Sequence, residues 1–152
     1  MTLQHFLLSV HVVASIVFIG GSAVATSLFP RYALVTAGAP GPNDEPSERN
    51  VAVARLLHRI TGKYAVAGIA VPVIGMILAS VQGRMGEIWI TAAMVITVLA
   101  GVLLAVQIHP MQKEALRDPD DGKRLRTLGM LAGIYNLLWT IVVVLMIIRP
   151  GS

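Results

Sequence analysis

The chain has 152 residues, of which 55% are hydrophobic and 13% charged, with a formal net charge of +4 and no cysteine. Soluble domains carry roughly 25% charged residues, so this composition excludes an ordinary soluble globule and predicts a protein embedded in a lipid bilayer. The lack of cysteine excludes disulfides, cysteine-ligated metal centres and a thiol nucleophile. The basic residues lie at the ends of apolar runs, which is typical of membrane topology and gives no indication of nucleic-acid binding.

Four apolar segments follow one another along the chain, at about residues 3–29, 60–81, 88–108 and 127–148. Each is long enough for a hydrocarbon core of about 30 Å. Barrel strands are shorter and alternate polar with apolar residues, so helices are expected. The sequence therefore predicts an all-α, integral membrane four-helix bundle that forms a single transmembrane domain over residues 1–152. Pro72 predicts a kink in the second helix, and His109 with Pro110 is expected to end the third.

The distribution of positive charge predicts the orientation. Of the 12 Lys and Arg residues, all except Arg84 and Arg149 lie in or beside the first and third connections. The positive-inside rule then makes residues 31–55 and 110–126 cytoplasmic loops and places both termini outside a bacterial cytoplasmic membrane. Within the first loop, Ser47 is expected to cap a helix that begins at Glu48. That helix would present Val53, Leu56, Leu57 and Ile60 on one amphipathic face.

Small residues at i, i+4 in every span predict where helices approach one another closely. The pairs are Gly21–Ala25, Gly75–Ala79, Gly101–Ala105 and Gly129–Gly133. Asn136 and Thr140 share a face of the fourth helix and are expected to point into the bundle, because an amide facing lipid is costly. Tyr135 and Trp139 share another face, and Trp89 fits an interfacial anchor.

No catalytic signature is present, so the sequence leaves open whether the chain is an enzyme. The spans hold no acidic residue between the interfaces, which disfavours an ion-coupled transporter. The remaining candidates are the histidines. At about 1.5 Å per residue, His11 lies roughly 12 Å inside its span, whereas His58 and His109 both lie near the cytoplasmic boundary. A depth difference of roughly 15–20 Å excludes a mixed pair on one iron.

Haem binding therefore has two alternative arrangements. His58 and His109 are the cross-helix pair at matching depth, with Arg55, Arg59 and Lys63 available for porphyrin propionates. Alternatively, His11 binds alone, with a non-histidine ligand, or with the His11 of a second copy. Each histidine also has a structural interpretation. His11 would bond to a neighbouring helix, His58 and the more exposed His5 would be interfacial, and His109 would favour the dipole at a helix C-terminus. Met76, Met94, Met130 and Met146 are interpreted as packing residues.

The first helix, "HVVASIVFIGGSAVATSLFPRY", resembles the opening helix of a group of small bacterial four-helix membrane proteins, in which a histidine precedes a glycine pair. The group includes the copper-resistance protein D family, the HemJ-type protoporphyrinogen oxidases and a predicted integral membrane family of unknown function. The last is the most similar, in its "QIHPMQ" exit from the third helix and its "VVVLMIIRPG" ending. Resemblance to the HemJ-type proteins implies haem binding at His11 and porphyrinogen oxidation.

Three functions stay open at this point: a membrane accessory or scaffold subunit, a haem- or porphyrin-binding protein active in electron transfer or porphyrinogen oxidation, and a small-solute or metal permease component. The expected surroundings are the lipid bilayer and either a second copy of the chain or another membrane protein. The composition identifies neither a metal nor a substrate.

Overall fold

The structure, a computed structural model, describes residues 2–36 and 49–151, and within these ranges helices are the only regular secondary structure. The chain forms four helical arms. The first arm is α1 (Leu3–Tyr32), and the second consists of α2 (Val51–Ala67) and α3 (Ala70–Val81). The third arm consists of α4 (Ile88–Val102), a π-helical segment η2 (Leu103–Ile108) and α5 (His109–Arg117). The fourth arm is α6 (Lys123–Ile148). In the described part of the chain, four arms are long and apolar enough to cross a membrane. The predicted all-α four-helix bundle is confirmed.

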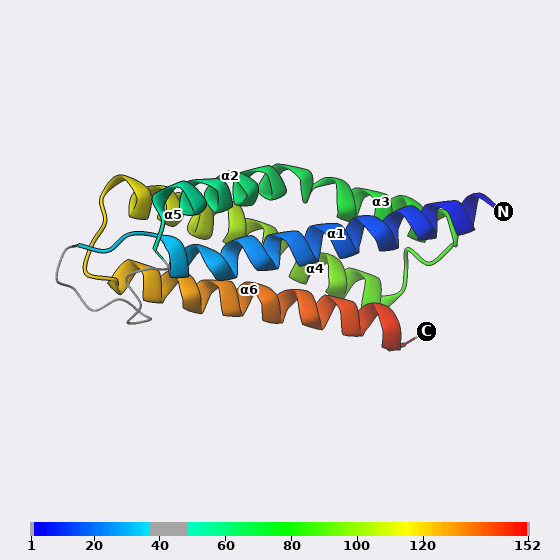
Figure 1. The fold of residues 1–152 in the computed structure, drawn as a ribbon. Coiled ribbons are helices and arrows are strands. Elements are labelled where there is room, and N and C mark those ends of the chain that lie inside the picture. The colour runs from blue at the N-terminus through cyan, green and yellow to red at the C-terminus, as the bar shows by residue number, and fades with distance from the viewer. Residues whose placement is uncertain (1, 37–48, 152) are drawn as a thin grey trace.

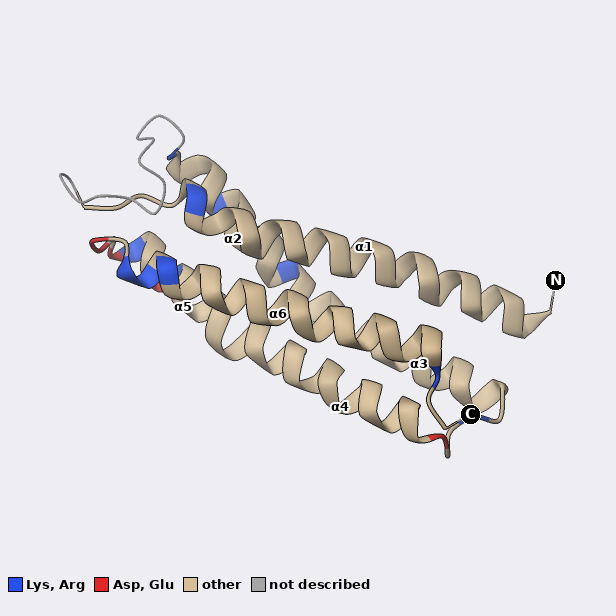
Figure 2. Ribbon diagram, turned by 90° about the horizontal axis from the view of Figure 1, so that it is seen from below, with Lys and Arg blue, Asp and Glu red and all other residues tan. Residues whose placement is uncertain are grey.

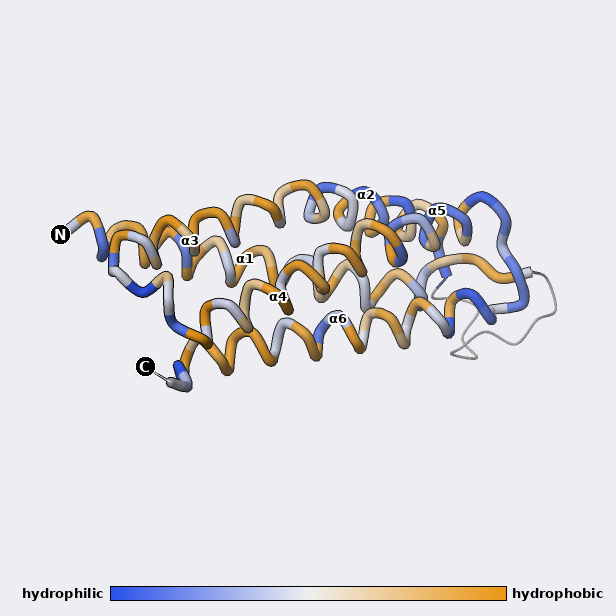
Figure 3. Tube along the Cα trace, turned by 180° about the vertical axis from the view of Figure 1, so that it is seen from behind, coloured by the Kyte–Doolittle hydropathy of each residue, from blue (hydrophilic) through white to orange (hydrophobic). Residues whose placement is uncertain are grey.

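Successive arms run antiparallel and pack into one bundle (Figure 1). α1 contacts α2, α3 and α6, and α4 packs along α6. Both termini lie at one end, here called the terminal end (Figure 1). Lys and Arg residues gather at the opposite end, here called the basic end (Figure 2). Hydrophobic residues cover the length between the two ends (Figure 3), as the transmembrane prediction requires.

The second arm is interrupted at residues 68–69, as Pro72 predicts. A proline ring blocks the helical bond to the carbonyl four residues earlier, here that of Gly68. The last turn of α2 closes instead with Gly68 N donating to Tyr64 O at 2.8 Å. A Cβ on Gly68 would lie 2.6 Å from Phe18 Cε2. The interruption therefore falls at a close contact between α1 and the second arm.

The third arm does not end at His109 and Pro110, contrary to the prediction. The helix passes through η2 and continues as α5 to Arg117. His109 N bonds to Leu104 O, five residues earlier, and this wider π turn precedes Pro110. Such a turn relieves the clash between the proline ring and the previous turn. His109 therefore lies inside a continuous arm, and its interpretation as a helix C-terminal residue is wrong. The loop expected over residues 110–126 is reduced to residues 118–122.

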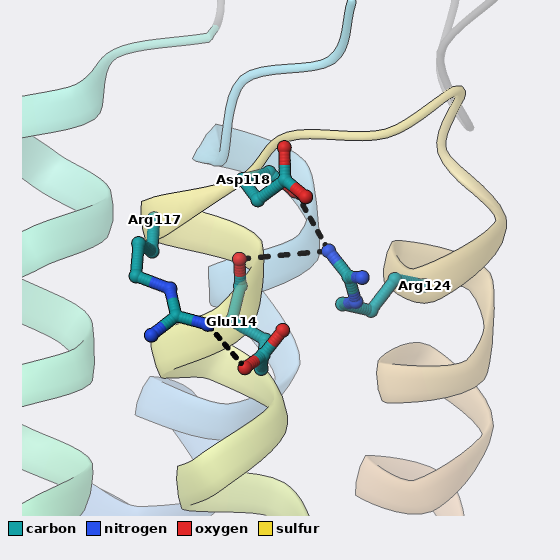
Figure 4. A network of polar contacts seen from close by, with 4 residues as sticks. All are labelled: Glu114, Arg117, Asp118 and Arg124. Atoms are coloured by element: carbon teal, nitrogen blue, oxygen red, sulfur yellow. Dashed lines mark hydrogen bonds and ion pairs between the residues drawn. The ribbon is translucent and has the colours of Figure 1, made fainter.

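A network of hydrogen bonds holds the short connection between α5 and α6 (Figure 4). Arg124 Nη1 donates to Asp118 O at 2.8 Å and to Glu114 O at 3.5 Å, while Arg117 pairs with Glu114 at 3.0 Å. Asp120 accepts from the backbone N–H groups of residues 122 and 124 at the start of α6. The connection expected to be a solvated loop is thus a capped helical corner.

The start of α2 also differs from the expectation. Ser47 and Glu48 lie outside the described residues, and α2 begins at Val51 with Asn50 as its N-cap. The expected apolar face is split, because Leu57 is buried whereas Leu56 is 51% exposed. The buried side of α2 carries Ala54, Leu57 and Thr61 instead.

Two of the four small-residue pairs lie at helix contacts and two do not. A Cβ on Gly21 would meet Tyr64 of α2 and one on Gly75 would meet His11 of α1, whereas Gly101, Gly129 and Gly133 have open space on that side. The expectation that Gly129 and Gly133 pack against another helix is therefore wrong. Their face of α6 is exposed on the surface of the bundle.

The polar residues of α6 likewise include some that contact another helix and some that do not. Thr140 is exposed, contrary to the prediction, and its hydroxyl donates to Asn136 O on its own helix. Asn136 is partly buried and its Nδ2 donates to Ser27 Oγ of α1 at 3.2 Å. Tyr135 and Trp139 are both buried, and the Tyr135 hydroxyl donates to Ser22 Oγ at 2.8 Å. The Tyr135 bond joins α6 to α1 within the apolar core, and the Asn136 bond joins the same two helices at the surface of the bundle.

Candidate functional site

His11 lies on the wall of a cavity in the terminal half of the bundle. Residues of α1, α3, α4 and α6 line this cavity, which has a volume of about 280 Å³. The His11 side chain is almost completely enclosed, with 7% exposure. The volume is close to the lower limit of small-molecule sites, which span about 300–1,000 Å³. We call this space the His11 cavity.

Two contacts orient the His11 ring. The ring lies beside the backbone of Val71 on α3, and its buried Nδ1 has no hydrogen-bond partner among the described residues. If Nε2 carries the ring proton, the lone pair of the imidazole lies on Nδ1. A Cβ on Gly75 would lie 2.9 Å from His11 Cε1, so a glycine is needed beside the ring. The bond from His11 to a neighbouring helix stays a prediction, and the buried Nδ1 is available to a ligand.

Soft side chains and one cation share this cavity. Met76, Met94 and Met146 line it from α3, α4 and α6. Their interpretation as scattered packing residues does not anticipate this convergence. Arg149 also lines the cavity, with its guanidinium 5.6 Å from the centre of the Trp89 ring. A thioether and an imidazole together are a known ligand pair for haem iron.

His58 and His109 meet at the basic half of the bundle, as their equal depth predicts. Their rings are stacked, with centroids 4.3 Å apart and planes inclined by 17°. Two histidines that hold one haem iron approach it from opposite faces of the porphyrin with their nitrogens toward each other. Rings stacked face to face do not present their nitrogens in that way. The arrangement seen here is therefore unlike a bis-histidine haem site.

A buried glutamine holds the stacked pair. Gln112 is completely buried, its Oε1 lies 3.0 Å from His58 Nδ1, and its Nε2 donates to Thr61 Oγ1 at 3.3 Å. Thr61 in turn donates to Leu57 O. Gln112 was not predicted from the sequence, because a helix end at Pro110 would have placed it in solvent. Its spacing of three residues from His109 is the signal that both share a helix face.

The two histidine sites are separate. The cavity lined by His58 and His109 shares no lining residue with the His11 cavity, which agrees with the predicted difference in depth. His5 is exposed and contacts Thr2 Oγ1 at 2.8 Å. Within residues 2–36 and 49–151, no group of three or more His, Cys, Asp or Glu side chains could hold a metal ion.

The fold and its apolar arms define a multi-pass membrane protein of the four-helix type. Searches against protein-family models, curated proteins and solved structures find no match to this chain. The function must therefore be argued from the two histidine sites themselves.

Proposed function

We propose that this chain binds a haem-type porphyrin within the membrane and that His11 is its protein ligand to the iron. The observation that carries the proposal is the buried Nδ1 of His11, which has no hydrogen-bond partner within residues 2–36 and 49–151 and belongs to a ring on the wall of a cavity. A buried polar atom without a partner costs about 1–3 kcal/mol. Ligation of a metal centre by this lone pair would offset that cost.

The surroundings of His11 fit this role. Metal-binding histidines usually donate their second ring N–H to a carboxylate or backbone carbonyl, which fixes the tautomer. The backbone of Val71 lies beside the His11 ring and would be such a partner. Met94 and Met146 line the cavity from α4 and α6, across from α1, and either thioether is a candidate second ligand. A bound haem would supply one-electron redox chemistry, which fits a role in electron transfer.

The shape and charge of the cavity set how such a ring would lie. A volume of about 280 Å³ encloses only part of a porphyrin. The remainder would extend between α3 and α4, which share few contacts, toward lipid. Arg149 at the cavity wall places a positive charge within reach of a propionate. The resemblance of the first helix to HemJ-type proteins supports the same histidine.

Visible spectra of the reduced protein, purified from haem-supplied cells, test the proposal. We expect a Soret band with sharp α and β bands in the parent protein and in the double variant His58→Ala/His109→Ala. His11→Ala should lose these bands. His5→Ala is the matched control, because it removes an exposed histidine from the same helix. Thermal unfolding in detergent shows whether His11→Ala is still folded.

Two results would overturn the proposal. A colourless parent protein would exclude haem as the resident ligand, and an accessory or scaffold role or a permease component would then remain. Loss of the bands in the His58 and His109 variant alone would show that the iron ligands are these two histidines at the basic half of the bundle.

A further inference from the structure

An open groove at the basic half of the bundle carries a second ligand-binding feature, distinct from the His11 cavity. The groove has a volume of about 730 Å³ and runs along α2 beside the start of α5. Its polar part is lined by Arg55, Arg59 and Lys63 together with the stacked pair of histidines. We call it the basic groove.

Among the described residues, the three cations of the basic groove have no anionic partner. They follow one another at i, i+4 and i+8 along one stripe of α2, a helix without an acidic residue. No ion pair joins them to an acidic side chain anywhere in residues 2–36 and 49–151. Glu114, an acidic residue of the neighbouring α5, is paired with Arg117. Like charges at i, i+4 destabilise a helix, so an anion bound beside this stripe would stabilise α2.

The stacked histidines form the floor of the groove and are held by contacts with α2 and α5. A Cβ on Gly62 would lie 2.8 Å from His109 Nε2, so glycine allows the ring to lie against α2. Gln112 holds His58 from below, through a bond of 3.0 Å to Nδ1. The imidazole edges and the three cations are thus presented on a preformed surface.

The other part of the groove is apolar. Val66 and Ala67 line it about one turn beyond Lys63, toward the middle of the membrane-spanning arm. Val66 is 73% exposed. A free phosphate ion would use only the cationic part of this lining. A molecule with an anionic head and an apolar tail would use both parts, and basic pockets at this depth commonly bind phospholipid headgroups.

We infer that the basic groove binds one anionic phospholipid. Arg55, Arg59 and Lys63 contact the phosphate and headgroup, and an acyl chain lies over Val66 and Ala67. The bound lipid neutralises the cationic stripe of α2 and covers the stacked histidines. This inference does not depend on haem binding, since it uses none of the residues of the His11 cavity.

The test measures lipid retention by the full-length protein. The detergent-purified protein is mixed with equimolar phosphatidylglycerol and phosphatidylcholine, and bound lipid is counted by native mass spectrometry. We expect one phosphatidylglycerol to be retained in preference to phosphatidylcholine. Removal of one surface cation is expected to weaken the retention of anionic lipid about fivefold. The variant Arg59→Gln/Lys63→Gln should therefore lose about 25-fold.

The matched control is Lys123→Gln/Arg126→Gln, which removes the same charge from exposed residues of α6 at the same end of the bundle. It should retain lipid like the parent protein. Equal losses in both variants would show diffuse surface attraction and overturn the inference. Stabilisation by inorganic phosphate as large as that by phosphatidylglycerol would overturn the assignment to a lipid. Melting temperatures without lipid verify folding, and the single variants Arg59→Gln and Lys63→Gln repeat the comparison with a smaller change.

Discussion

Gly75 and Gly133 occupy equivalent positions in the sequence pattern, each in a small-residue pair at i, i+4, but their surroundings differ. The space beside Gly75 is filled by the His11 ring, whereas nothing lies within 4 Å of a Cβ placed on Gly133. Only the first glycine is needed for two helices to approach. At the residue scale, a glycine in this bundle therefore allows close helix packing only where it lies on a helix face that contacts another helix.

We predict that Gly75→Leu lowers the stability of the protein by about 1–3 kcal/mol, because the new side chain overpacks the contact with His11. Gly133→Leu should leave stability nearly unchanged, because its side chain would extend into lipid. Thermal unfolding of the two variants in the same detergent provides the measurement. A large loss in Gly133→Leu would mean that another molecule, such as a second copy of the chain, covers this face of α6.

Arg49 shows how one side chain completes a helix end. Its Nη1 donates to Pro30 O at 3.1 Å and also bonds to Ala33 O, at the C-terminus of α1. Asn50 N donates to Tyr32 O at 2.9 Å. Burial lowers the pKa of Arg49, yet arginine starts so far above neutral pH that the charge is kept. At the element scale, Arg49 therefore fastens the start of α2 to the end of α1.

Arg49→Ala should cost about 1.5–3 kcal/mol, since it removes hydrogen bonds from a charged donor and leaves buried carbonyls without a partner. A matching decrease in the midpoint of thermal unfolding is expected. Arg126→Ala is the control, because this residue is exposed at the same end of the bundle. Arg49→Lys should recover only part of the loss, because a lysine does not reproduce the planar fork of donors. Equal midpoints for Arg49→Ala and the control would show that the cap contributes nothing.

At the scale of the whole molecule, the separation of charge defines two unlike ends. All Lys and Arg residues except Arg84 and Arg149 belong to the segments that form the basic half of the bundle. The two termini lie together at the other end (Figure 1). The bundle therefore has a definite polarity, and the positive-inside rule converts this polarity into an orientation in the membrane.

We predict that a periplasmic reporter fused after Ser152 is active, whereas the same reporter inserted at residues 118–122 is inactive. A cytoplasmic reporter should give the reverse pattern at both positions. Comparison of the two positions controls for expression of the fusion. Activity of the cytoplasmic reporter at the C-terminus would show that the orientation is the reverse of the predicted one, and it would not affect the number of arms.

The sequence alone determined the number of arms, their helical type and the interruption near Pro72, because apolar length and proline chemistry are local properties. It also determined that His58 and His109 could meet and that His11 could not join them, since depth along a helix follows from residue counting.

Only the tertiary structure decided which face of each helix points inward. It placed Gly129, Gly133 and Thr140 on the surface of the bundle and buried Gln112. It also carried the third arm beyond Pro110 through a π turn and brought three methionines to the His11 cavity. In a soluble helix the apolar stripe marks the buried face, but lipid is as apolar as the interior of a bundle. The rotation of each helix is therefore set by side-chain packing between helices, which a single sequence does not display.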